Sequence, residues 1–160
     1  MRKLLQFVFM MMATQPAWSA CSGSSPNWTS TPDSSSMQSC VSNASNGDTI
    51  IISGGSATYS STVTISKGLT IKVATGQTVT LTSSSASGPP FFTITGTGSN
   101  FVHISGDNGS GDCSANSSNC GLVLVRQNDP GFNSSAILIK GPVLAFRLDH
   151  ILGNKGDAFL

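Results

Sequence analysis

The chain has 160 residues, with eight Lys and Arg against seven acidic residues, all of them Asp, and only 9% of its residues are charged. So few and so balanced charges form no basic surface, which excludes nucleic acid as an expected partner. Short apolar clusters recur among many Ser, Thr, Asn and Gly residues, so a disordered chain is excluded, and the length suits one domain.

The N-terminal residues 1–19 have the pattern of a signal peptide. Two basic residues precede an apolar run from Leu4 to Ala13, and small residues follow Pro16. A membrane-spanning helix needs about 20 apolar residues, so this run is too short to be one. We favour cleavage after Ser19, which predicts a protein that is secreted or at the cell surface, without a transmembrane segment in the mature chain.

Two alternatives to free secretion remain open. The first residues could form a buried helix, which we rank well below a leader. Cys21 follows Ser19 and Ala20, so the leader could also belong to a lipoprotein. Trp18 stands where a lipoprotein signal normally has Leu, and we therefore rank lipidation second.

Four cysteines occur, and an even number in an exported chain favours disulfides. Three pairings are possible. Proximity in the sequence favours Cys21–Cys40 and Cys113–Cys120. A zinc site is the alternative, but the chain has no CxxC motif and no nearby pair of histidines to support it.

After the leader, residues 20–35 contain little to bury and are expected to form an extended lead-in. A short amphipathic helix is then predicted near residues 36–46, since four apolar residues share one helical face: Met37, Cys40, Val41 and Ala44. A serine among residues 34–36 would supply the N-cap, and Gly47 would end the helix.

From Asp48 onward, short apolar clusters alternate with turn-forming residues, which is typical of an all-β domain over residues 36–160. The clusters begin at Thr49, Val63, Leu69, Val79, Phe91, Phe101, Leu122, Ile137 and Val143. A β-sandwich would need more tight hairpin signals than the chain contains. Strands of three to five residues that recur about every 20–25 residues favour a right-handed parallel β-helix, a solenoid with a short N-terminal amphipathic cap helix.

Two phrases carry a resemblance to a known family. Gly47-Asp48-Thr49 precedes an apolar strand, and Lys67-Gly68 precedes the apolar strand at Leu69. Residues 36–160 therefore resemble the N-terminal portion of the secreted, pectate-lyase-like parallel β-helix proteins. The resemblance implies a polysaccharide ligand but no single activity, because that fold serves lyases, hydrolases, epimerases and adhesins.

The candidate catalytic residues are Arg147, Asp149 and His150. Strand alternation places Arg147 and Asp149 on one face, and it places Phe146 and Leu148 on the other. An exposed Asp could act as a general acid or base, and Arg could hold a sugar carboxylate. The alternative is a solvated ion pair with His150 at a turn.

No cofactor is indicated by a clear motif. Residues 107–112 contain several oxygen ligands at short spacing, so Ca²⁺ is conceivable, but the loop lacks the pattern of an EF-hand. His103 lies alone in an apolar strand, and the sequence shows no partner for it.

These observations predict a protein that acts on or binds polysaccharide, with a non-catalytic adhesin or glycan-binding protein as the alternative. Whether it is an enzyme stays open. Two or more acids and a base on one surface strip would favour an enzyme. The last residues, Asp157 to Leu160, resemble the start of another strand, so we expect the domain to be truncated at its C-terminus.

Overall fold

The structure is a computed structural model that describes residues 21–85, 88–96, 98–113, 116–126, 135–141 and 143–153. The predicted signal peptide and the expected strand at the C-terminal end lie outside these ranges. The first elements are β1 (Cys21–Ser24), β2 (Asn27–Ser30), α1 (Ser34–Asn43), β3 (Thr49–Ile52), β4 (Gly55–Tyr59), β5 (Val63–Ile65) and β6 (Thr70–Val73). They are followed by β7 (Val79–Ser83), β8 (Phe92–Thr95), β9 (Gly98–Ser105), a 3₁₀ turn (Ser117–Asn119), β10 (Leu122–Val125), β11 (Ile137–Lys140), β12 (Val143–Asp149) and β13 (Ile151–Gly153).

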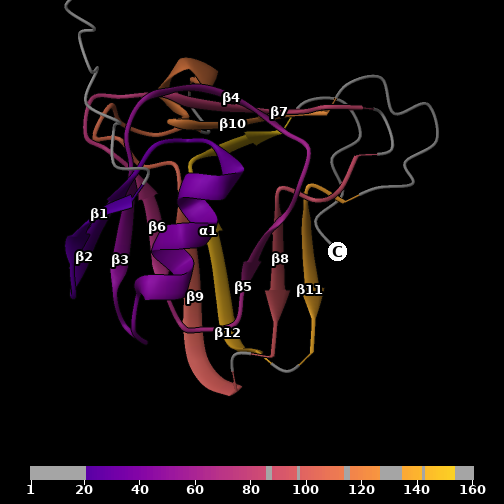
Figure 1. Cartoon of the computed structure of the whole chain (residues 1–160). Helices are drawn as coiled ribbons and strands as arrows, with labels where there is room; N and C mark the ends of the chain where they lie inside the picture. Colours follow the sequence, from indigo (N-terminus) through magenta and orange to yellow (C-terminus); the bar gives the residue numbers. More distant parts are fainter. Residues whose placement is uncertain are drawn as a thin grey trace, which may run out of the picture.

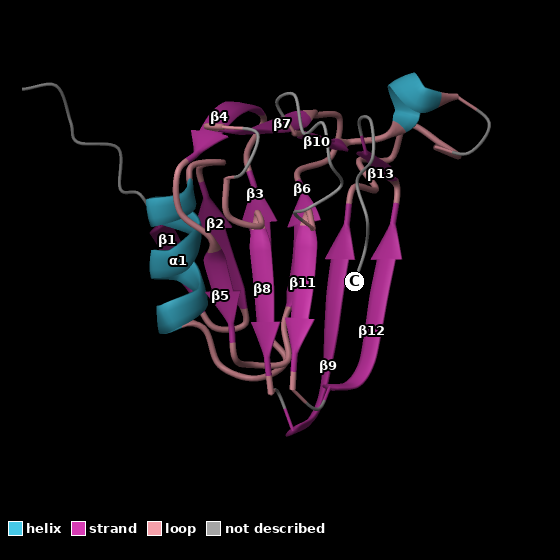
Figure 2. Cartoon of the chain, turned by 90° about the vertical axis from the view of Figure 1, so that its right-hand side faces the viewer, coloured by secondary structure: helices cyan, strands magenta, loops and turns pink. Residues whose placement is uncertain are grey.

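The strands form three sheets around one hydrophobic core (Figures 1 and 2). The six-stranded sheet has the order β1-β2-β3-β6-β9-β12, the four-stranded sheet β13-β10-β7-β4, and the three-stranded sheet β11-β8-β5. From β3 onward, consecutive strands belong to these three sheets in turn. All pairs are parallel except β1 with β2.

The structure corrects the predicted fold class, a right-handed parallel β-helix. The chain is mostly β, but its strands are divided among three separate sheets of unequal size, and the largest sheet is mixed because β1 runs antiparallel to β2. Paired residues are also not evenly spaced, since Thr49 pairs with Thr70, 21 residues later, whereas Phe92 pairs with Ile137, 45 residues later. The regular repeat on which we based the solenoid is therefore not found in the described strands.

The register of the six-stranded sheet explains the core. Ile50 of β3 pairs with Ile71 of β6, Ile71 with Ile104 of β9, and Ile104 with Leu148 of β12. The three isoleucines are fully buried, and Leu148 packs against the same core. Removing one such side chain from water contributes about 1.5–3 kcal/mol, so this aliphatic row fixes the register of its four strands.

Helix α1 buries the predicted apolar face and lies at the end of the sheets, beside β2 and β5 (Figure 2). The N-cap is Asp33 and not one of the following serines, because its carboxylate accepts hydrogen bonds from Ser36 N and from the hydroxyls of Ser35 and Ser36. Burial alone would raise the pKa of Asp33, but these bonds outweigh it and hold that pKa far below its ordinary value. The helix ends at Asn43, with Ala44 as its C-cap, earlier than predicted.

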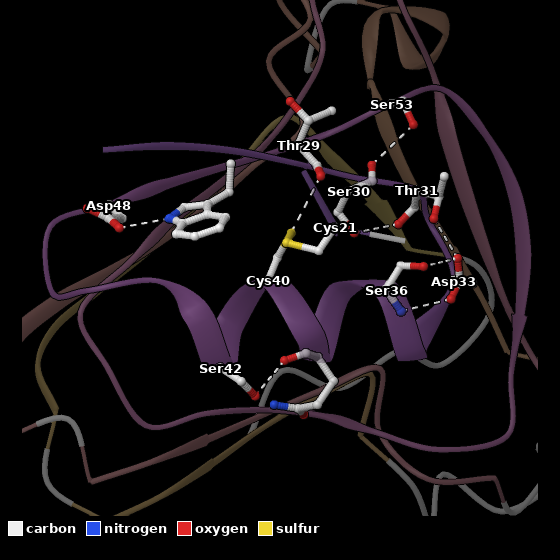
Figure 3. Close-up of a disulfide and its surroundings, with 12 residues drawn as sticks. Cys21, Thr29, Ser30, Thr31, Asp33, Ser36, Cys40, Ser42, Asp48 and Ser53 are labelled. Atoms are coloured by element: carbon white, nitrogen blue, oxygen red, sulfur yellow. Dashed lines mark hydrogen bonds between the residues drawn. A yellow bond between two sulfur atoms is a disulfide. The ribbon is translucent and has the colours of Figure 1, made fainter. Parts of the chain in front are cut away.

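The segment expected to be an extended lead-in contains the β1–β2 hairpin, which is joined to α1 by the Cys21–Cys40 disulfide (Figure 3). Asp48 ties this hairpin to the start of β3. Its carboxylate accepts hydrogen bonds from Trp28 Nε1 at 2.9 Å, from Ser25 Oγ at 2.8 Å and from Ser45 N at 2.9 Å. The disulfide and the carboxylate therefore close the N-terminal end of the core.

Lys67 completes this closure at the C-terminal end of α1. Its Nζ donates hydrogen bonds to the carbonyls of Val41, Ser42 and Ala44 at 3.2, 2.8 and 2.6 Å. The last carbonyls of a helix lack partners within the helix and carry partial negative charge, so an ammonium group stabilises them. The following Gly68 packs so tightly that a Cβ there would collide with Cβ of Asn100.

We predict that Lys67→Met lowers the free energy of unfolding by about 1–3 kcal/mol, because the substitution removes charged hydrogen bonds but keeps the aliphatic stem. Urea unfolding followed by circular dichroism would measure this loss. Lys140→Met is the matched control, since Lys140 is exposed on β11, and β8 separates β11 from β5, the strand of that sheet that contacts α1. Equal stability of the two variants would contradict the assigned role of Lys67.

Candidate functional site

The outer face of the six-stranded sheet has a row of polar side chains on three adjacent strands. In β6, β9 and β12, Thr70 pairs with His103 and His103 with Arg147, while Lys72 pairs with Ser105 and Ser105 with Asp149. Successive residues of a strand point to opposite faces, so these side chains lie on the face opposite the aliphatic row. We call Thr70, Lys72, His103, Ser105, Arg147 and Asp149 the polar strip.

The carboxylate of Asp149 organises one half of the polar strip. Oδ2 lies 2.8 Å from His103 Nε2 and 3.0 Å from Arg147 Nε, and Oδ1 accepts a hydrogen bond from the Ser105 hydroxyl. Asp149 and His103 are mostly buried, with 17% and 20% of their side chains exposed, whereas Arg147 is 64% exposed. One carboxylate thus fixes the position of a histidine and of an exposed guanidinium.

The protonation state of this cluster follows from its contacts. Burial on its own raises the pKa of Asp149, but the hydrogen bonds from Ser105 and His103 and the charges of His103 and Arg147 outweigh burial and lower it. Asp149 is therefore ionised at neutral pH and can only accept hydrogen bonds. Because Asp149 can only accept, His103 Nε2 donates the hydrogen of their 2.8 Å contact, and Nδ1 is the ring nitrogen that Asp149 does not engage.

A cavity of about 290 Å³ lies beside the polar strip, between β6 and the loop that follows β9. Its polar lining includes Lys72, His103, Ser105 and Asp107. Asp107 N donates to Ser105 Oγ at 3.1 Å, so Asp107 and Asp149 both bond to the same serine. Pockets that bind drug-sized ligands have volumes of about 300–1,000 Å³, so this cavity is at the small end of that range and has room for a small group only.

His150 lies outside the polar strip, although it was predicted together with Arg147 and Asp149. It forms the corner between β12 and β13 with a φ of 52°, which is unusual for a residue other than glycine. Its Nδ1 is 3.6 Å from Asp149 Oδ1, which is within ion-pair distance but beyond hydrogen-bond distance. His150 and Asp149 both border a second hollow, of about 620 Å³, which Leu148, Ile151 and the Cys113–Cys120 disulfide also line.

In the loop from Asp107 to Gly121, side-chain oxygens accept hydrogen bonds from backbone N–H groups of the same loop. Asp107 Oδ1 accepts from Gly109 N, and Asn108 Oδ1 accepts from Ser110 N. The loop leaves and rejoins the sheets at a narrow neck, where Gly121 N donates to Gly106 O at 2.9 Å. Within the described ranges, no group of three or more His, Cys, Asp or Glu side chains could hold a metal ion.

Both predicted disulfides are confirmed, since Cys21 is bonded to Cys40 and Cys113 to Cys120. The second one lies within the loop from Asp107 to Gly121 and links its two arms. The parts of the chain that the structure describes contain no helix with the length and hydrophobicity needed to cross a bilayer.

Sequence reasoning did not assign four members of the site, Thr70, Lys72, His103 and Ser105. Lys72 and Ser105 are 33 residues apart, and Ser105 and Asp149 are 44 apart, because loops of different length separate the strands. No fixed spacing could therefore have aligned them. The usable signal lay within each strand. Each strand has two polar residues that are two positions apart, and these alternate with the buried aliphatic residues.

No protein-family model, curated protein or solved structure matches this chain. The resemblance to pectate-lyase-like proteins stays a prediction. The candidate site rests on the geometry of the polar strip alone.

We predict that Asp149→Ala lowers the free energy of unfolding at pH 7 by roughly 1–3 kcal/mol, because His103 and Ser105 lose their acceptor. The folded-state pKa of Asp149 lies below its ordinary value, so its stabilisation is present above about pH 4 and is lost as pH falls through the folded value.

Urea unfolding at pH 7 and at pH 3 would test this. The difference between the wild type and Asp149→Ala should be large at pH 7 and smaller at pH 3. A difference that is the same at both pH values would show that the ionised carboxylate is not its source.

Proposed function

We propose that this protein is exported and binds an acidic polysaccharide along the polar strip. The observation that supports this best is the register of β6, β9 and β12, which puts Lys72 and Arg147 on either side of the central strand. Two strand spacings and a shift of two residues separate their backbones by roughly 12 Å. The two cations are therefore spaced to contact different carboxylates of one extended glycan chain.

Arg147 is well suited to bind a carboxylate. Its Nε forms an ion pair with Asp149 Oδ2 at 3.0 Å, and 64% of its side chain is exposed, so the guanidinium is held at one end before a ligand arrives. A guanidinium that is already held in place loses less conformational freedom on binding, and its planar fork matches a carboxylate. Lys72 is exposed on the opposite side of β9 and adds a second positive charge.

Export is supported by the two disulfides together with the predicted signal peptide. Disulfides persist in oxidising compartments and are rare in the cytosol. The Cys21–Cys40 bond holds the first strand against α1, so the closure of the core depends on it. A secreted or surface location also gives the protein access to extracellular polysaccharides.

We expect Lys72→Ala and Arg147→Ala each to weaken binding to polygalacturonate by roughly 3- to 30-fold, the range for a charged hydrogen bond at a partly screened surface. Isothermal titration calorimetry at low salt would measure the affinities. Lys140→Ala removes an exposed charge on the three-stranded sheet and should leave binding unchanged. A wild-type protein that binds neither polygalacturonate nor alginate would refute the proposed function.

A second candidate function is catalysis on the bound polysaccharide, and the His103–Asp149 pair favours it. A carboxylate that orients a histidine through one ring nitrogen leaves the other nitrogen to act as a base. The ring also borders the 290 Å³ cavity, where a sugar would be in reach.

Incubation with polygalacturonate and alginate would separate the two candidates. An enzyme would produce new reducing ends, unsaturated sugars or epimerised residues, and His103→Gln would reduce the rate by at least about 100-fold, as expected for loss of a general base. A protein that binds these glycans and leaves their length, unsaturation and composition unchanged would instead be a non-catalytic glycan-binding protein.

A further inference from the structure

One large apolar side chain is exposed in line with the polar strip. Phe101 of β9 has 44% of its surface exposed, and only Ile139 and Leu152 are comparable among the large apolar residues that the structure describes. Phe101 precedes His103 by two residues and Ser105 by four, so strand alternation puts all three side chains on the outer face. The polar strip therefore continues into an aromatic ring along its central strand.

The neighbours of Phe101 leave the ring accessible. Ala145 of β12 lies directly opposite it and contributes only a methyl group. The His103 ring is 6.0 Å away, centroid to centroid, and is tilted by 45°, so it touches Phe101 from one side and does not cover it. Ile139 and Leu152, in contrast, belong to the other two sheets, so neither side chain lies on the face of the polar strip.

We infer that Phe101 is a stacking platform for a pyranose ring of the acidic polysaccharide. This inference rests on the proposed function and adds a subsite to it. One face of a pyranose exposes mainly C–H groups, which are apolar and slightly positive, and the face of an aromatic ring is apolar and slightly negative. Stacking would remove both surfaces from water.

The dimensions fit a single chain of several sugars. From Phe101 to Ser105 the central strand rises about 13 Å, so the ring lies at one end of the site and the Lys72–Ser105–Asp149 row at the other. Arg147 pairs with His103, between the two ends. A glycan that stacks on Phe101 would thus direct carboxylates of its following sugars toward Arg147 and Lys72.

The test compares Phe101→Ala, Phe101→Trp and the control Ile139→Ala by titration with polygalacturonate oligosaccharides. We expect Phe101→Ala to weaken the affinity by roughly tenfold, in line with the loss of one buried aromatic contact, and Ile139→Ala to have no effect. Phe101→Trp should retain the affinity and show a blue shift of its fluorescence on binding, relative to the wild-type signal. That variant keeps the test decisive if Phe101→Ala folds poorly.

Salt dependence separates stacking from charge. Screening weakens the contacts of Lys72 and Arg147, so Lys72→Ala should reduce the dependence of affinity on salt, whereas Phe101→Ala should lower the affinity without changing that dependence. If the wild type binds and Phe101→Ala binds equally well, the stacking inference is overturned and the proposed function stands. If the wild type does not bind, the proposed function fails first, and the subsite fails with it.

Discussion

The parallel register of the six-stranded sheet is the constraint on which both the core and the candidate site depend. Because side chains alternate between the two faces, the pairing that buries Ile50, Ile71 and Ile104 in one row also sets Lys72 beside Ser105 and Ser105 beside Asp149. A slip of one residue in β9 would turn the side chain of Ile104 to the outer face. The same slip would separate the polar groups from one another. The hydrophobic effect therefore positions polar groups that it does not itself bury.

Within the site, most of the organisation comes from one ionised carboxylate. Asp149 joins His103, Ser105 and Arg147, which come from two strands and differ in exposure. The pKa of Asp149 therefore determines both how much the cluster stabilises the fold and whether the carboxylate can orient His103. The N-terminal closure, with Asp33, Asp48 and Lys67, uses the same kind of contact for a different purpose, because its charges satisfy backbone and side-chain groups around α1.

The sequence predicted local features well and long-range geometry poorly. Helical periodicity predicted the apolar face of α1, and proximity in the sequence predicted the two disulfides. Strand alternation predicted that Arg147 and Asp149 share the outer face. The β-helix prediction failed because it assumed an even repeat, whereas loops of different length separate the paired strands. His103 was missed for the same reason, since its partner Asp149 is 46 residues away and no local pattern connects the two. The serine N-cap failed because Asp33, one residue earlier, is the stronger acceptor.

The narrow neck of the Asp107–Gly121 loop has a consequence for engineering. Gly106 and Gly121 meet through one backbone hydrogen bond, and the backbone at Gly106 is so close to the carbonyl of His150 that no side chain fits there. Just beyond this neck, Asn108 Nδ2 donates to Gln77 O and Asn108 O accepts from Gly76 N, both at 2.7 Å, and the Cys113–Cys120 bond constrains the outer part of the loop. A foreign peptide of similar length could replace the loop tip without shifting either strand that the neck joins. The chain thus has a position for inserted sequence beside the candidate site, where the loop can be changed while the scaffold is kept.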